Sequence, residues 1–309
     1  MSKQVLVSVV MITYGHEKHI REAIEGVLMQ KGDFNLELII ANDSSPDATD
    51  IVISEILKTH SKADRIRYIK HEKNIGMMPN FIFALQQTQG KYIALCDGDD
   101  YWTDSCKLQK QVDFLEANSD YVLSFHKVKI LKPSGEFVDD FITNVPENYE
   151  TQETLARLGN YIHTPSVVFR NIKMEFPPEF SLSPIGDYFL YMILAEHGKL
   201  NYIEEEMAVY RYGVGVISSM NNYMIACNNV MMYSCMIANV TNVNVKPILM
   251  KRQIEVITEF KNTFELKNVI IFKIPFFICY FKERINEIIV NPNKSLKRLK
   301  SKMRKIFSK

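Results

Sequence analysis

The sequence predicts an α/β fold in which a mostly parallel sheet is flanked by helices and followed by a helical C-terminal extension. Over the first 120 residues, apolar runs rich in β-branched residues alternate with segments whose apolar residues recur at helical spacing. Such alternation is typical of parallel strands joined by crossover helices. From about residue 220 the sequence becomes helical and rich in methionine. We therefore predict a first domain over residues 1–218 and a helical extension over residues 219–309.

Four strands and four helices are expected before residue 120. The strands are expected at 4–14, 36–43, 65–70 and 91–97, and all but the short third one are apolar runs suited to burial. The helices follow them at 17–30, 45–58, 79–87 and 103–115. Ser45 before Pro46 predicts an N-cap with proline in the first turn, and Thr103-Asp104 predicts the start of the fourth helix.

The pattern is less regular after residue 121. We expect a strand at 121–131, a short helix at 151–158 and a strand at 165–170. A helix from about Tyr188 to His197 should end at Gly198, because glycine is favoured after the last turn of a helix. A further strand follows this helix.

The near-neutral charge of the chain conceals two parts of opposite sign. The 309 residues carry a net charge of +1, and residues 294–309 hold eight basic and no acidic side chains, so the remainder carries −7. The five cysteines show no C-x-x-C spacing, which favours reduced thiols over a disulfide framework or a zinc site. Together with a strand-like run almost at the first residue, this predicts a cytoplasmic protein.

Three carboxylates crowd the end of the fourth predicted strand, at Asp97, Asp99 and Asp100. Their mutual repulsion calls for a counter-charge, and carboxylate oxygens are favoured ligands of Mg²⁺ and Mn²⁺. Gly98 lets the backbone turn so that Asp97 and Asp99 face one ligand. The alternative is a loop whose acids favour the dipole of the next helix. Since the chain has no glycine-rich phosphate loop after the first strand, a metal held by Asp99 is the natural candidate for neutralising a pyrophosphate.

Polar residues also follow the first two predicted strands. The first ends at Thr13-Tyr14 and the second at Asn42-Asp43. Because ligands of parallel α/β sheets bind beyond the carboxyl ends of the strands, these groups and the carboxylate cluster outline one site. Asp43 is suited to accept hydrogen bonds from a ribose or a base, and Tyr14 to stack on a base. A turn-forming Asn-Asp pair is the alternative for Asp43.

Four segments together resemble the family 2 glycosyltransferases. They are VVMITYGHEKHIREAIEGVLMQ, ELIIANDSSPDAT, KNIGMMPNF and GKYIALCDGDDYW, and the similarity covers roughly residues 5–215. The resemblance implies the GT-A fold, with a Rossmann-like, mostly parallel sheet flanked by helices. It also implies an inverting enzyme that uses a nucleoside-diphosphate sugar and a divalent metal, Mn²⁺ or Mg²⁺.

The resemblance also implies roles for the polar strand ends. Thr13 and Tyr14, at the end of the first strand, and Asp43 would hold the nucleoside. Asp97 and Asp99 match the family's D-x-D motif, which implies that they hold the ribose and the metal that bridges the diphosphate.

The family's acidic base precedes a helix in a later loop, where this chain has Asp187 in the segment IGDYF. Direct displacement at the anomeric carbon requires that the acceptor hydroxyl lose its proton on the face opposite the leaving diphosphate. A single displacement, assisted by one base, implies that the configuration at the anomeric carbon is inverted. Capping of the helix that begins at Tyr188 is the alternative role of Asp187.

The chain departs from the family pattern near Arg211. Relatives often carry YR-x-H, whose histidine contributes to the metal or diphosphate site, whereas Gly213 stands at that position here. His163 and His126 are candidate replacements, although a lone histidine is more often structural. Arg211 itself is suited to pair with the diphosphate, and a structural ion pair is the equal alternative.

The C-terminal segment predicts contact with a membrane surface. Residues 268–281 are strongly apolar but too short and interrupted to span a bilayer. In residues 294–309, apolar side chains recur at helical spacing among the eight bases, which is typical of an amphipathic helix on an anionic bilayer. A solvated tail is the alternative, and no nucleic-acid-binding motif accompanies the charge. We therefore expect a protein peripheral to the inner face of the cell membrane, without a nucleic-acid partner.

These features predict a metal-dependent, inverting hexosyl- or N-acetylhexosaminyltransferase that moves a sugar from a UDP-sugar to a glycan or lipid-linked acceptor. The resemblance implies a bacterial surface polysaccharide as the product. A sugar-nucleotide pyrophosphorylase would need a glycine-rich basic loop after the first strand, which ITYGHEKH lacks. The remaining alternative, raised by Gly213, is a catalytically inactive, membrane-docked module that binds nucleotide sugars.

Overall fold

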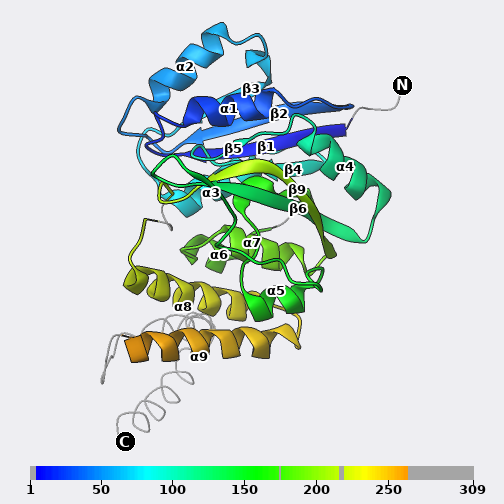
Figure 1. Ribbon diagram of the computed structural model, residues 1–309, viewed down its shortest axis with the longest axis vertical. Helices are drawn as coiled ribbons and strands as arrows, with labels where there is room; N and C mark the ends of the chain where they lie inside the picture. Colours follow the sequence, from blue (N-terminus) through cyan, green and yellow to red (C-terminus); the bar gives the residue numbers. More distant parts are fainter. Residues whose placement is uncertain (1–4, 174, 216–218, 264–309) are drawn as a thin grey trace, which may run out of the picture.

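The computed structural model describes residues 5–173, 175–215 and 219–263, which are coloured in Figure 1. The segments at 268–281 and 294–309 and the domain boundary at residue 218 lie outside these ranges, so the expectations placed on them stay predictions. None of the helices in the described ranges has the length and apolarity that crossing a bilayer requires.

The first half of the chain forms the parallel part of the sheet. Its strands are β1 (Val5–Thr13), β2 (Phe34–Asn42), β3 (Ile66–Lys70) and β4 (Tyr92–Leu95). They stand in the order β3-β2-β1-β4, and all their pairings with one another are parallel. The connections contain α1 (Ile20–Leu28), α2 (Thr49–Thr59), the 3₁₀ turn η1 (Ala63–Arg65) and α3 (Met77–Gln86). The predicted alternation of strands and helices is confirmed.

The second half completes the sheet. It adds β5 (Tyr101–Trp102), β6 (Tyr121–Leu131), β7 (Phe137–Asp139), β8 (Val168–Arg170) and β9 (Lys199–Arg211). β8 is antiparallel to β4 and β6, whereas β6 and β9 run parallel over ten paired residues. Most paired residues of the sheet therefore lie in parallel pairings, and the predicted fold class is confirmed. β5 and β7 were not expected, because two or three residues are too short to show a strand pattern.

Two apolar clusters cover the two faces of the sheet. One packs beneath α1, α2 and α4 (Lys107–Ala117), and the other beneath the remaining helices. These helices are α3, α5 (Gln152–Leu158), α6 (Pro178–Leu182), α7 (Asp187–Leu194), α8 (Asn222–Asn239) and α9 (Val245–Thr263), together with the 3₁₀ turn η2 (Thr164–Ser166). In Figure 1, α8 and α9 lie side by side below α6 and α7, and α9 also lies below α5. The C-terminal helices thus extend the second cluster.

Two predicted helix starts are wrong. α2 begins at Thr49, and Ser45 instead donates its hydroxyl to Asn42 Oδ1 (2.7 Å) and accepts from the Gly15 amide (3.0 Å). α4 begins at Lys107, because β5 and a turn capped by Asp104 come first. In both cases the side chain with capping chemistry accepts or donates hydrogen bonds in the segment before the helix.

Candidate active site

The ends of β1, β2 and β4 meet at one edge of the sheet, as the sequence predicts. The Asp43 amide donates to the Thr13 carbonyl (3.0 Å), and the Gly98 amide donates to the Ile12 carbonyl (3.0 Å). A Cβ at Gly98 would lie only 2.7 Å from Thr13 Oγ1. Glycine is therefore required for the carboxylate loop to pack against the end of β1.

The carboxylates of Asp97, Asp99 and Asp187 interact at this edge, and His163 acts electrostatically on Asp187. Burial, reinforced by the charges of Asp99 and Asp187, raises the pKa of Asp97 well above its usual value. Asp99 is 8% exposed, and burial also raises the pKa of Asp187. Mutually repelling, desolvated carboxylates are the setting that a hard divalent cation stabilises.

The protein ligands suit a metal that keeps part of its shell for substrate. Among the described residues, no three His, Cys, Asp or Glu side chains converge as a complete ligand set. Asp97 and Asp99 would supply two carboxylates and leave positions for diphosphate oxygens and water, a common arrangement for Mg²⁺. The donor set thus fits Mn²⁺ or Mg²⁺.

Asp187 is the first residue of α7, and Gly186 occupies the N-cap position. Its Oδ1 accepts from the Tyr188 amide (2.7 Å), and its Oδ2 accepts from Asn160 Nδ2 (3.2 Å) and Thr164 Oγ1 (3.3 Å). These donors fix the carboxylate beside Asp97. A positioned carboxylate whose pKa is raised by burial is suited to accept a proton.

Asp43 is not the spare group that its position after β2 suggested. Its two carboxylate oxygens accept from the Ile75 amide (2.7 Å) and the Gly76 amide (2.9 Å), and the residue is 3% exposed. It therefore orders the turn before α3. Tyr14 is 49% exposed at the same edge, and contact of Asp43 and Tyr14 with a nucleoside stays a prediction.

Arg211 forms the structural ion pair that was the alternative to diphosphate binding. Its guanidinium pairs with Glu22, donates to the Asp99 carbonyl and lies 4.5 Å from the centre of the Tyr101 ring. Its main-chain amide donates to Asp100 Oδ1 (2.8 Å). Arg211 thus braces the carboxylate loop from β9, and direct contact with a diphosphate stays a prediction.

The two histidines proposed as replacements lie in different surroundings. His163 Nε2 is 2.9 Å from Asp140 Oδ2, and its charge interacts with Asp187. His126 is buried within β6, where burial and the charge of Lys107 hold its pKa well below the usual value. Of the two, His163 is beside the candidate site.

Gly213 has a physical reason to be glycine. Its φ is +80°, a conformation that L-residues rarely adopt, and an added Cβ would lie 3.2 Å from Pro133 Cγ. A histidine at this position would be strained.

Sequence reasoning did not identify four residues that the fold brings to the site, namely Glu22, Asp140, Asn160 and Thr164. Each is an isolated polar residue in a helix or loop. No motif distinguishes these positions before the tertiary contacts are known.

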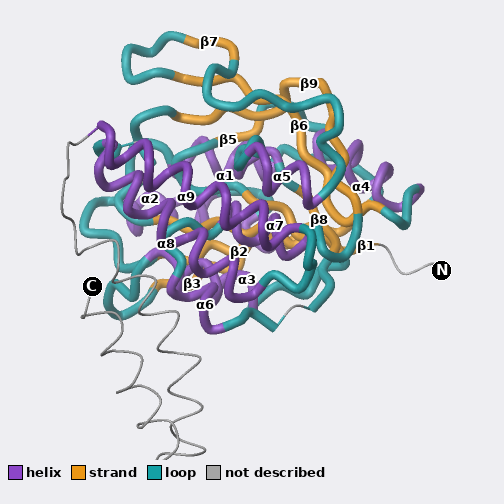
Figure 2. Tube along the Cα trace, turned by 90° about the horizontal axis from the view of Figure 1, so that it is seen from below, coloured by secondary structure: helices purple, strands orange, loops and turns teal. Residues whose placement is uncertain are grey.

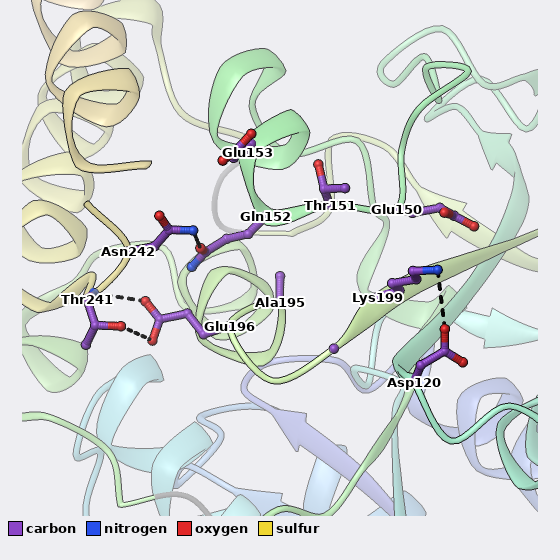
Figure 3. Close-up of a pocket in the computed structure, with 11 residues that line it drawn as sticks. Asp120, Glu150, Thr151, Gln152, Glu153, Ala195, Glu196, Lys199, Thr241 and Asn242 are labelled. Atoms are coloured by element: carbon purple, nitrogen blue, oxygen red, sulfur yellow. Dashed lines mark hydrogen bonds and ion pairs between the residues drawn. The ribbon is translucent and has the colours of Figure 1, made fainter. Parts of the chain in front are cut away.

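A cavity of about 520 Å³ lies elsewhere on the molecule (Figure 3). Its lining includes Asp120 and Lys199, which form an ion pair near the amino ends of β6 and β9. The candidate site adjoins the carboxyl end of β9, at Arg211. The cavity is therefore separate from the carboxylate cluster.

Comparison with known proteins agrees with this geometry. The family model described as Glycosyl transferase family 2 matches residues 8–174. An uncharacterised protein of Mycobacterium tuberculosis is 37% identical over 66% of this chain and 58% of its own length. A Bacillus subtilis protein named as a teichuronic acid biosynthesis glycosyltransferase is 33% identical over 48% of this chain and 57% of its own length. The chain thus spans less than two thirds of these relatives.

Solved structures share the fold at low sequence identity. Residues 1–349 of S. aureus TarS in complex with UDP-GlcNAc match with a TM-score of 0.58 and 18% identity, over 88% of this chain and 79% of that fragment. A mannosyltransferase from Pyrobaculum calidifontis in complex with GDP-Man and Mn²⁺ matches with a TM-score of 0.57 and 13% identity, over 97% and 85% of the two chains.

Proposed function

Because the chain belongs to glycosyl transferase family 2, we propose that it transfers a hexosyl or N-acetylhexosaminyl group from a nucleoside-diphosphate sugar, preferably a UDP-sugar, to a glycan or lipid-linked acceptor. The observation that carries the proposal is the convergence of Asp97, Asp99 and Asp187 at one sheet edge. The product is a surface polysaccharide, in keeping with the name of the B. subtilis relative.

Asp187 accepts the proton of the acceptor hydroxyl as that hydroxyl attacks the anomeric carbon. Its donors Asn160 and Thr164 hold the carboxylate in place during the transfer. Asp97 and Asp99 would hold a divalent cation, which would supply positive charge to the leaving diphosphate. A single displacement inverts the anomeric configuration.

Two solved structures of similar fold contain nucleoside-diphosphate sugars, which supports this class of donor. Their nucleobases differ, so they do not select uridine over guanosine. TarS was crystallised with UDP-GlcNAc, and the Pyrobaculum enzyme was solved with GDP-Man and Mn²⁺. We prefer UDP because of the resemblance of the sequence segments to the family.

We also propose that residues 268–309 dock the protein on the inner leaflet of the membrane. Flotation with anionic vesicles, before and after removal of these residues, tests this proposal. Equal soluble fractions would contradict docking.

The experiment for the donor is a thermal-shift screen of nucleotide sugars with Mn²⁺, followed by release of the nucleoside diphosphate. A donor at a hundredfold excess over its Kd stabilises the native state by about 2.7 kcal/mol. We expect Asp99→Asn to lose both signals and Asp120→Asn, an exposed carboxylate at the opposite end of β6 and β9, to keep them. A shift by GDP-sugars alone would contradict the UDP assignment.

A second candidate function is an inactive nucleotide-sugar-binding module, which the glycine at position 213 favours. Donor binding without any release of nucleoside diphosphate from the wild-type protein would support it against the transferase.

A further inference from the structure

Exposed apolar side chains gather where the loop after β7 meets the loop after β9. The centres of the Phe141 and Tyr212 rings are 5.3 Å apart, and the rings pack nearly edge to face. Phe141 is 55% exposed and Tyr212 is 37% exposed. Ile142, beside Phe141, is 45% exposed. We call Phe141, Ile142 and Tyr212 the aromatic platform. Figure 2 shows β7 on a hairpin that projects from the body of the molecule, near β9.

The platform is connected to the candidate base by a short series of contacts. Asp140 accepts from the Ile142 amide (2.8 Å), which shapes the loop, and interacts with His163 Nε2 (2.9 Å). The next residue, Thr164, donates to Asp187 Oδ2 (3.3 Å). The loop that presents Phe141 is therefore held directly beside the residues that position Asp187.

The β9 side of the platform is held by the same histidine. The His163 ring lies 4.9 Å from that of Tyr210, two residues before Tyr212. His163 thus contacts a neighbour of each half of the platform, Asp140 on one side and Tyr210 on the other. The position of the platform relative to Asp187 therefore depends on tertiary contacts and not on the conformation of one loop.

The surroundings of the platform favour a neutral partner over an anionic membrane. Lys129 pairs with Asp139 (2.6 Å), and Lys132 pairs with Glu136 (3.1 Å). Because these lysines are neutralised, they offer little attraction to acidic phospholipids. The electron-rich faces of aromatic rings attract C–H groups, which one face of a pyranose ring presents, and apolar patches of this kind mark binding surfaces.

We propose that the aromatic platform is the surface on which pyranose rings of the acceptor glycan pack, so that the attacking hydroxyl is directed toward Asp187. The inference rests on the proposed function, because it names the acceptor subsite of the same transfer. Phe141 and Tyr212 contact the rings of the acceptor, and Asp140 and His163 position the platform.

The test is saturation-transfer NMR of the full chain with UDP, Mn²⁺ and methyl glycosides of glucose, galactose, mannose and N-acetylglucosamine. We expect at least one glycoside to bind the wild-type protein. Phe141→Ala and Tyr212→Ala should weaken its binding by about tenfold, equivalent to about 1.4 kcal/mol. Tyr212→Phe, which keeps the ring, and Ile51→Ala, an exposed apolar control on α2, should bind as the wild type does.

Three results would overturn the inference. These are equal binding by all variants, no binding of any glycoside to the wild type, or loss of anionic-vesicle flotation in Phe141→Ala with glycoside binding intact. The last would make the platform a membrane contact. Hydrolysis of the donor by the wild type, in which water receives the sugar and UDP is released without an acceptor, tests the proposed function separately, so the two failures are distinguishable.

Discussion

Replacing Arg211 with methionine tests whether this side chain braces the carboxylate loop or binds the diphosphate. Methionine retains an unbranched apolar stem and removes the guanidinium, which contacts Glu22, the Asp99 carbonyl and the Tyr101 ring. The main-chain hydrogen bond from Arg211 to Asp100 is kept. The substitution therefore isolates the guanidinium.

The contacts of the guanidinium differ in strength. The Glu22 side chain is 55% exposed, so its ion pair contributes at most about 1 kcal/mol. The charged hydrogen bond to the Asp99 carbonyl contributes about 1.5–3 kcal/mol, and the Tyr101 ring about 0.5–2 kcal/mol. Because contacts of one group are not additive, we expect Arg211→Met to lower the free energy of unfolding by about 3–4 kcal/mol. Glu22→Gln should lower it by no more than about 1 kcal/mol.

Differential scanning calorimetry separates these expectations. At roughly 2–4 °C per kcal/mol, Arg211→Met should lower the Tm by roughly 6–16 °C. Glu22→Gln should lower it by less than about 4 °C. The same samples are then titrated with Mn²⁺ and the nucleotide sugar that stabilises the wild type. Folded Arg211→Met should still bind the nucleotide, with a weaker affinity for Mn²⁺ because the loop of Asp97 and Asp99 is less well held.

A wild-type Tm for Arg211→Met together with loss of nucleotide binding would refute this reasoning, since the guanidinium would then be a ligand contact. An effect of Glu22→Gln as large as that of Arg211→Met would show that the ion pair, and not the Asp99 carbonyl or the ring, dominates.

Three further predictions concern the site and the core. Asp187→Asn should reduce kcat by roughly 10²–10⁴-fold while donor binding is kept, and an equal loss in Asp120→Asn would show that the effect is not specific to the base. Gly98→Ala should raise the Kd for Mn²⁺, because its Cβ would lie 2.7 Å from Thr13 Oγ1; unchanged titration calorimetry would contradict the close approach. Burial lowers the pKa of Lys107 to about 7 from 10.5, so the unfolded state holds an extra proton between these values and the native state is weakened as pH falls from 10.5 to 7. In urea unfolding, Lys107→Met should therefore be more stable than the wild type by several kcal/mol at pH 7. This difference should disappear toward pH 10. A difference that does not depend on pH would contradict the lowered pKa of Lys107.

Much of the candidate site was predictable because it depends on the carboxyl ends of parallel strands. The apolar runs that became β1, β2 and β4 are buried on both faces and end in polar residues, so Thr13, Asp43 and Asp97 had to meet once the sheet was parallel. The helix starts were less predictable, since Ser45 and Asp104 have the chemistry of caps and use it in loops.

The sequence by itself determined the fold class, the sheet edge that bears the site and the aspartates gathered there, because burial periodicity and strand ends are local properties of the chain. Only the tertiary structure decided that Asp43 orders the turn before α3, that Arg211 pairs with Glu22, and that the loop of Phe141 is held beside Asp187. Glu22 and Arg211 are 189 residues apart in the chain. A hydrogen-bonding group has several chemically equivalent partners in the sequence, and the packing of the folded chain determines which of them lies within reach.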